Sequence, residues 1–317
     1  MKKFIFTASF FCTGLLGLAF VADFIISQRL RKSESHMLKV WNDIYSGNLQ
    51  NDVLIMGSCR ASEQIDPKIL DSILGVNSYN IGIDGRPINS QIIRYDAYRR
   101  NNVKPKLIIQ NIDLFTLYTN PDFPYEREQF FPYFFDNFLK KAVTKYEKYS
   151  FLEKYLPAYR YLGYKDLIQF ALGVKRRKWE GSLWGEGILY KGFWVPTKTW
   201  DGSDLKNEYV YGEDSIALHL FDNYLAKAYS ENIQVVFVYA PIYIEVTNRT
   251  QNIEGMYQMY DSIARKYNIP ILDYNYDTIS YDTTFFFTAS TLNKIGAELF
   301  STKLAYDIDS LLNLNHK

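Results

Sequence analysis

Hydrophobic residues in this chain follow two kinds of pattern. Short apolar runs bounded by turn residues are typical of buried strands. Five such runs occur, over residues 53–56, 79–83, 107–112, 235–239 and 269–272. Longer segments with helical spacing lie between or after them, over roughly 89–99, 215–230, 255–266 and 294–312. Strands that alternate with helices predict a parallel sheet covered by helices on both faces.

The N-terminus carries a different pattern. Lys2 and Lys3 precede Phe4–Ala22, an uncharged run long enough to cross a bilayer as a helix. A cleaved signal peptide is the alternative, but Phe20 stands where a small residue would be needed before Asp23. We therefore expect a transmembrane signal anchor over residues 1–28. We expect the rest of the chain on the extracytoplasmic side, in the periplasm or at the cell surface.

The remaining chain divides into a connecting segment and one large domain. Residues 29–50 are expected to form a juxtamembrane helix or linker, and residues 51–317 an α/β domain. Five strands suit a three-layer, flavodoxin-like sandwich. An aromatic-rich insertion at about 114–212 interrupts the alternation and predicts a helical subdomain or cap. Packing of this cap onto the sheet is the simplest role for its aromatics; stacking on sugars or lying against a membrane surface are the alternatives.

A basic run and one histidine are further candidate sites, and neither indicates a particular function. Lys175–Lys178 is either a solvated helix face or a contact for anionic lipid or polymer. His219 lies among apolar residues of a predicted helix and is interpreted as a surface or packing residue.

Composition and charge exclude several classes of protein. There are 36 Lys and Arg against 35 Asp and Glu, a net charge of +1, so no global field favours nucleic acid. The 2 cysteines exclude a disulfide framework, and the sequence shows no metal-ligand cluster, P-loop or dinucleotide fingerprint. We therefore expect neither a metal nor another cofactor.

The strongest chemical signal follows the first predicted strand. Residues 53–56 run into Gly57-Ser58, and ligands of open parallel sheets bind beside the carboxyl ends of the strands. A serine there can act as a nucleophile, with its own N–H helping to bind an oxyanion. The alternative is a serine that only caps the following helix. Arg60 could bind an anionic group, or form a salt bridge with Asp84 or Asp113.

Three segments together carry a resemblance to a known family. Gly57-Ser58-Cys59-Arg60, Tyr79-Asn80-Ile81-Gly82 and Ile109-Gln110-Asn111-Ile112-Asp113 resemble the first three blocks of the SGNH/GDSL hydrolase superfamily. The chain is most similar to its membrane-anchored cell-envelope branch, which includes proteins of teichoic-acid D-alanyl transfer and alginate O-acetylation. The resemblance covers about residues 50–310 and matches the central insertion poorly.

This resemblance implies roles for particular residues. Ser58 would be the nucleophile, and the Gly82 amide would donate to the oxyanion hole. Asn111 or Asp113 would stand where the family places an oxyanion-hole Asn, and Asp113 would be a poor substitute because a carboxylate repels an oxyanion. The candidate ligand-binding side chains beside them are Arg60, Asn80 and Asp113.

The last family block departs from the pattern. The frame is retained in Leu292-Asn293 and Gly296-Ala297, but Thr288 stands at the position of the family's Asp and Thr291 at that of its His. A serine hydroxyl is a weak nucleophile without a neighbouring base, and threonine cannot take its proton at neutral pH.

Two functions therefore remain, with a structural envelope protein as a weaker third. The first is an esterase or O-acyltransferase that acts through Ser58 on acylated cell-surface glycans or polymers, with a membrane O-acyltransferase as an implied partner. The second is a catalytically inactive protein that binds a glycan, an acyl ligand or a partner protein in the same crevice.

Overall fold

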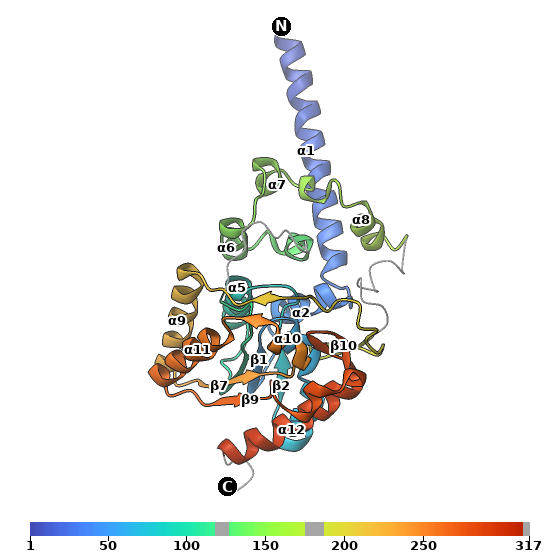
Figure 1. Ribbon diagram of the computed structural model, residues 1–317. Coiled ribbons are helices and arrows are strands. Elements are labelled where there is room, and N and C mark those ends of the chain that lie inside the picture. The colour runs from blue at the N-terminus through green and yellow to red at the C-terminus, as the bar shows by residue number, and fades with distance from the viewer. Residues whose placement is uncertain (118–126, 175–186, 313–317) are drawn as a thin grey trace. The chain divides into compact units, whose positions relative to one another are not determined.

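The computed structural model describes residues 1–117, 127–174 and 187–312. It divides into two compact units, which are described separately. The helical unit comprises residues 1–42 and 121–183, and the sheet unit residues 43–120 and 184–317. The predicted α/β class, the parallel sheet and the apolar N-terminal helix are all confirmed (Figure 1).

Five parallel strands form the centre of the sheet unit, in the order β2-β1-β3-β7-β9. Each corresponds to one of the five predicted apolar runs. Their bounds are β1 (Val53–Met56), β2 (Ser78–Asn80), β3 (Leu107–Asn111), β7 (Gln234–Tyr239) and β9 (Ile271–Asp273). All residues of β1, β2 and β3 are buried, which explains why β1 and the first three residues of β3 are continuous apolar runs.

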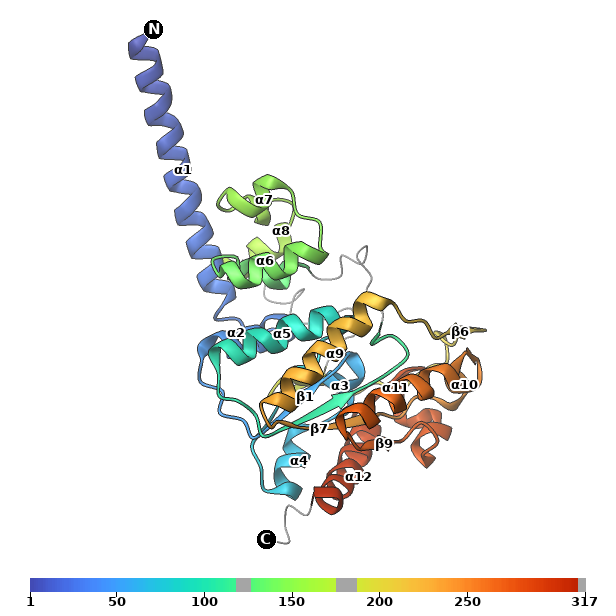
Figure 2. The same cartoon turned by 90° about the vertical axis from the view of Figure 1, so that its left-hand side faces the viewer.

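Helices cover both faces of this sheet (Figure 2). Side chains alternate between the faces, so Ile55, Ile109 and Val236 pack with Phe300 and Leu304 in one core. On that side lie α3 (Cys59–Gln64), α4 (Pro67–Leu74) and α12 (Lys294–Leu312). On the other side, α9 packs against both α5 and α11, which have the bounds α5 (Ile88–Asn101), α9 (Ser215–Ser230) and α11 (Ile253–Tyr267).

Short elements surround the main sheet. A hairpin of β4 (Gly187–Tyr190) and β5 (Phe193–Pro196) places its turn against the β2 edge, where the Asn80 amide donates to the Lys191 carbonyl at 2.9 Å. Phe193 and Val195 are part of the sheet unit's core. Residues 187–212 of the expected insertion therefore belong to the sheet unit. The other short elements are β6 (Tyr209–Val210), α10 (Ile244–Asn248), β8 (Thr250–Gln251), η3 (Thr278–Tyr281), η4 (Thr283–Phe285), β10 (Phe286–Thr288) and β11 (Thr291–Leu292).

The helical unit joins the N-terminal helix to the aromatic-rich segment. Within it, the Phe131 ring packs edge-on against Tyr161 and Tyr164, with centroids 5.7 and 5.0 Å apart. Among the described residues, α1 alone is long and apolar enough to cross a membrane, and an 18-residue stretch of it has a mean hydropathy of 2.1. The predicted Lys175–Lys178 run lies outside the described residues. The unit's elements are α1 (Lys2–Leu30), the start of α2 (His36–Ser46), η1 (Arg127–Tyr133), α6 (Asn137–Tyr146), α7 (Phe151–Tyr155), η2 (Tyr159–Tyr161) and α8 (Lys165–Ala171).

Gly296 in the first turn of α12 offers a test of this packing. A Cβ at Gly296 would lie 2.3 Å from the Phe285 carbonyl oxygen, so Gly296→Ala must displace backbone. We expect it to lower the free energy of unfolding by about 1–3 kcal/mol. Gly255 occupies the same position in α11 with no atom within 4 Å of a built Cβ, so Gly255→Ala should be neutral or stabilising by up to ~1 kcal/mol. Denaturant unfolding of both variants in detergent measures this difference, and equal stabilities would contradict the proposed close contact.

Candidate active site

Ser58 stands at the turn between β1 and α3. Gly57 precedes it with φ +147°, and a Cβ there would lie 2.8 Å from the Cβ atoms of both Ala61 and Asn111. Only glycine lets the chain turn this close to β3. Ser58 Oγ accepts a long hydrogen bond from the Arg60 amide at 3.4 Å, so the serine does cap α3.

The same hydroxyl also donates to a carboxylate. Ser58 Oγ lies 2.5 Å from Asp113 Oδ2, and Asp113 follows the end of β3. Asp113 accepts three further hydrogen bonds, from the Phe115 amide (2.9 Å), Thr116 Oγ1 (3.1 Å) and Asn111 Nδ2 (3.3 Å). Ser58 is 8% exposed and Asp113 is 2% exposed. The pair is therefore joined by a short hydrogen bond that is shielded from bulk water.

The structure separates the two candidates at the end of β3. Asn111 Oδ1 accepts the Ala240 amide at 3.3 Å, and its Nδ2 donates to Asp113. Asn111 thus links β3 to the end of β7, while Asp113 is the residue that contacts Ser58.

The second predicted block is occupied by internal hydrogen bonds. The Gly82 amide donates to Asn80 Oδ1 at 2.9 Å. Asn80 Nδ2 donates to the carbonyls of Ala61 (2.8 Å) and Ile65 (2.9 Å). Asn80 is fully buried, so its polar groups hold this loop against α3. In this state the Gly82 amide is directed at Asn80 and not at an oxyanion.

Arg60 is buried beside the ends of β7 and β9. It donates to the Ala240 carbonyl and, at 3.5 Å, to Asn275 Oδ1. Asn275 Nδ2 in turn donates to Tyr257 Oη at 2.9 Å. Burial lowers the pKa of the Arg60 guanidinium, and the charge of Asp113 acts in the opposite direction. Arg60 therefore supplies positive charge to this edge of the sheet.

Thr288 and Thr291, the two threonines of the last sequence block, lie on β10 and β11. Thr288 Oγ1 and Thr291 Oγ1 are 2.7 Å apart and hydrogen-bonded. Thr291 also bonds to Glu63, a buried residue of α3 that the sequence analysis did not single out. Burial, with a smaller effect from the charge of Asp84, raises the pKa of Glu63 well above its ordinary value. Its place five residues after Ser58 was the only sequence signal for it.

Among the described residues of the sheet unit, no histidine is hydrogen-bonded to Ser58, and Cys59 is not an activated nucleophile. Of the three histidines, only His219 lies among the described residues of the sheet unit. It is exposed on α9 and bonds to Asn223 Nδ2 at 3.0 Å, as its surface interpretation predicted. Burial and the charges of Asp84, Glu63 and Asp113 raise the pKa of Cys59 well above its ordinary value. The Cys59 thiol is therefore protonated and a poor nucleophile.

No group of three or more His, Cys, Asp or Glu side chains within residues 1–117, 127–174 and 187–312 is arranged to hold a metal ion.

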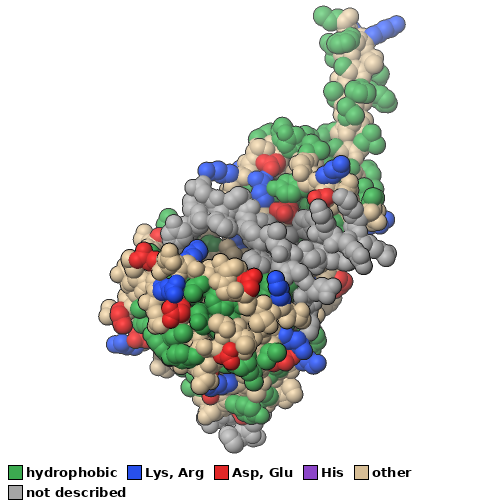
Figure 3. All heavy atoms as spheres, turned by 45° about the vertical axis from the view of Figure 1, so that its right-hand side comes forward, with side chains coloured by type: hydrophobic (Ala, Val, Ile, Leu, Met, Phe, Trp, Pro, Cys, Tyr) green, Lys and Arg blue, Asp and Glu red, His purple; other side chains and the backbone are tan. Residues whose placement is uncertain are grey.

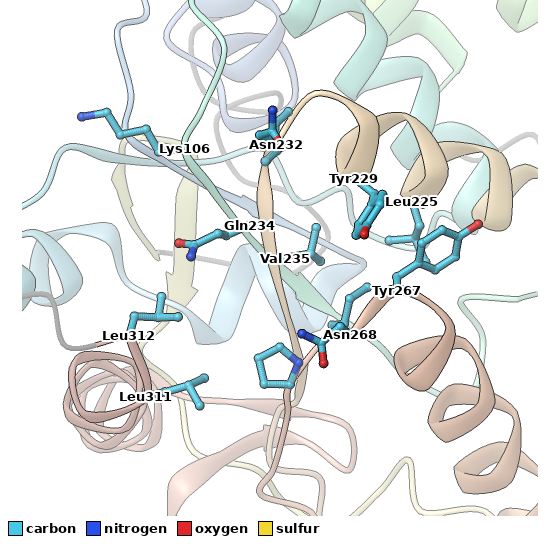
Figure 4. Close-up of a pocket in the computed structure, with 13 residues that line it drawn as sticks. Lys106, Leu225, Tyr229, Asn232, Gln234, Val235, Tyr267, Asn268, Leu311 and Leu312 are labelled. Carbon is cyan, nitrogen blue, oxygen red and sulfur yellow. The ribbon is translucent and has the colours of Figure 1, made fainter.

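A cavity of about 980 Å³ lies elsewhere, at the amino ends of the strands (Figure 4). Gln234 begins β7, Pro270 precedes β9, and Lys106 precedes β3, whereas Ser58 follows the carboxyl end of β1. Because the strands are parallel, this cavity lies at the amino ends of the strands and Ser58 lies at their carboxyl ends, on opposite sides of the sheet unit. Lys106 is the one charged residue among those lining it, and Lys106 pairs with Asp52 at 2.8 Å. The cavity therefore adds no nucleophile or base to the Ser58 site.

Comparison with known proteins does not add to this geometry. No protein-family model matches the chain, and the search of curated proteins found no match.

Glu63 gives the site a predicted pH dependence. The unfolded chain releases this proton near pH ~4.3, whereas the folded chain keeps it to higher pH. The folded state then binds more protons, so this carboxyl's contribution to stability is present below the ordinary glutamate pKa and is lost as pH rises through the raised one. Glu63→Gln keeps a neutral side chain that can bond to Thr291. We expect its melting temperature, relative to that of the native chain, to increase between pH 5 and pH 8. If the melting temperatures of the variant and the native chain change equally with pH across that range, Glu63 is ionised in the folded protein.

Proposed function

We propose that this chain is a membrane-anchored, SGNH-type protein of the cell envelope that acts on acyl esters through Ser58. The Ser58–Asp113 hydrogen bond is the observation that carries this proposal. The strand order β2-β1-β3-β7-β9 supports it, because it is the 2-1-3-4-5 order of flavodoxin-like sheets. Ser58 lies where such sheets bind ligands, at the carboxyl ends of the strands.

Asp113 takes the role of base in the proposed reaction. As Ser58 Oγ attacks the acyl carbon, its proton passes to Asp113 Oδ2, and the carbonyl electron pair becomes an oxyanion. The carboxylate becomes neutral as the oxyanion forms, so the total charge of the site does not change. Collapse of this intermediate expels the alcohol, which takes the proton from Asp113, and leaves an acyl-Ser58. Water or a glycan hydroxyl then accepts the acyl group.

The substrate class and location belong to the same proposal. Acylated glycans or polymers of the cell surface are the substrates that the sequence resemblance implies, with a membrane O-acyltransferase as a partner that supplies acyl groups. The exposed apolar helix α1 supports membrane anchoring. We place the sheet unit on the extracytoplasmic side, where those polymers occur.

A second function is favoured by a separate observation. The Gly82 amide is already bonded to Asn80, and Thr288 and Thr291 are bonded to each other. A crevice with these groups satisfied internally fits a non-catalytic protein that binds an acylated glycan or a partner protein.

Labelling with a fluorophosphonate separates these two functions, because the reagent reacts with activated serines. In the native full chain we expect labelling that is absent in Ser58→Ala and unchanged in Ser72→Ala, whose hydroxyl is exposed on α4. Asp113→Asn removes the proton acceptor while keeping a similar shape. It should slow labelling by about 100-fold or more, as loss of a general base does.

Two outcomes would contradict the proposed chemistry. No labelling of the native chain, with its melting curve intact, would establish the non-catalytic function. Labelling that persists unchanged in Asp113→Asn would show that another group activates Ser58.

Restoring the two absent family residues gives an independent prediction. Thr288→Asp with Thr291→His should raise hydrolysis of a simple acyl ester, because the two positions are already within hydrogen-bond distance of each other. Each single variant is the control and should gain less, since such residues act as a unit. A folded double variant with no gain would mean that β10 and β11 do not present these positions to Ser58.

A further inference from the structure

The apolar N-terminal helix has a sharply defined end. Its residues Phe4–Ala22 lie outside the core of the helical unit, and the buried residues of α1 are Ile26, Ser27 and Leu30. At ~1.5 Å per residue the exposed apolar run is about 28 Å long, close to the ~30 Å hydrocarbon core of a bilayer. If α1 spans the membrane, as proposed above, the bilayer surface therefore lies near Asp23.

A polar cluster fixes the helical unit to α1 at this level. Arg160 Nη1 and Nη2 donate to the two carboxylate oxygens of Asp23 at 2.6 and 2.5 Å. The Ala158 amide donates to Asp23 at 2.7 Å, and Ser27 Oγ bonds to Tyr161 Oη at 2.7 Å. Residues 158–161, which follow α7 in the chain, are thereby held within about one helical turn of the expected membrane surface.

The chain on both sides of this segment exposes large apolar side chains. Phe151 is 74% exposed, Tyr155 63% and Leu162 63%. The rings of Phe151 and Tyr155 are 4.9 Å apart, and Lys140 Nζ lies 5.4 Å from the Tyr155 ring. Aromatic rings with a lysine beside them are the side chains that occupy the boundary between lipid headgroups and acyl chains.

These side chains are held outward by a well-formed helix start. Ser150 and Glu153 form a capping box at α7, with the Ser150 amide donating to Glu153 at 2.7 Å and the Glu153 amide donating to Ser150 Oγ at 3.2 Å. Arg127 also pairs with Glu153. The exposure of Phe151 is therefore a property of the folded helical unit and not of a frayed end.

We propose that α7 and the following loop form a membrane-contact surface, with Phe151, Tyr155 and Leu162 inserted into the lipid interface beside the anchor. Both views place α7 beside α1, toward the N-terminal side of the helical unit (Figures 1 and 2). A space-filling view shows hydrophobic side chains gathered where the anchor emerges from this unit (Figure 3). A bilayer is the occupant that fits, because the anchor ends at Asp23 within this same unit. This inference rests on the proposed anchoring.

Lipid-dependent quenching of tryptophan tests the surface in the full chain. Phe151→Trp adds a reporter on α7, and Tyr306→Trp adds a control at a residue that is 60% exposed on α12. Both proteins are reconstituted in phosphatidylcholine–phosphatidylglycerol vesicles, with or without lipids brominated near the top of the acyl chain. Relative to the native chain, we expect the added emission of Phe151→Trp to be quenched several-fold more than that of Tyr306→Trp.

The remaining outcomes overturn the proposal and show why. No bromine quenching of the added Phe151→Trp emission, in chains that float with the vesicles and with a reporter that is not blue-shifted, would place α7 in water while keeping the anchor. A blue-shifted reporter that bromine does not quench would mean that protein covers the surface. Failure of the native chain to float would remove the anchor and the surface together, while leaving the fluorophosphonate result at Ser58 unaffected.

Discussion

The register between β1 and β3 is the constraint on which the Ser58 site depends. The two strands are parallel, and Met56 pairs with Gln110, so both end at the same edge of the sheet. The chain then turns at Gly57, whose lack of a side chain allows the close approach to Asn111. A slip of one residue would reverse the faces of a buried strand and is excluded by the core. Ser58 and Asp113 meet because this register leaves their loops side by side.

Local sequence determines the parts of the structure that could be predicted. Val53–Met56 is buried on both faces, so its apolar run identifies the strand without knowledge of its neighbours. The Ser58–Asp113 bond joins residues 55 positions apart, and the spacing of either segment says nothing about the distance between the two side chains. Glu63 was missed for a related reason, because α3 has six residues and shows no clear period. The sequence around Phe193 is as rich in aromatic residues as the helical unit, so composition does not separate the two. Only its packing places Phe193 in the core of the sheet unit.

The groups around Ser58 are arranged for a fixed geometry. The Asn80 side chain is hydrogen-bonded to the backbone of Gly82, Ala61 and Ile65. The Asn111 side chain joins β3 to the end of β7. Such bonds hold the loops in place without reorganisation, which benefits either catalysis or tight binding. The difference between these functions lies in the proton acceptor. A carboxylate that already accepts the Ser58 proton in a hydrogen bond is in position to take it.

Two carboxylates, the half-buried Asp23 and the fully buried Asp113, differ in the charge of their hydrogen-bond donors. Asp23 receives a bidentate arginine, so Arg160 neutralises its charge within the helical unit. Asp113 receives its hydrogen bonds from Ser58, Thr116, Asn111 and one backbone amide, all of them neutral groups. Hydrogen bonds from neutral donors satisfy a carboxylate but leave its negative charge in place. Asp23 is thus suited to joining two segments. Within the described chain, Asp113 has no cation among its hydrogen-bond donors, and this is the arrangement that the proposed base needs 2.5 Å from the Ser58 hydroxyl.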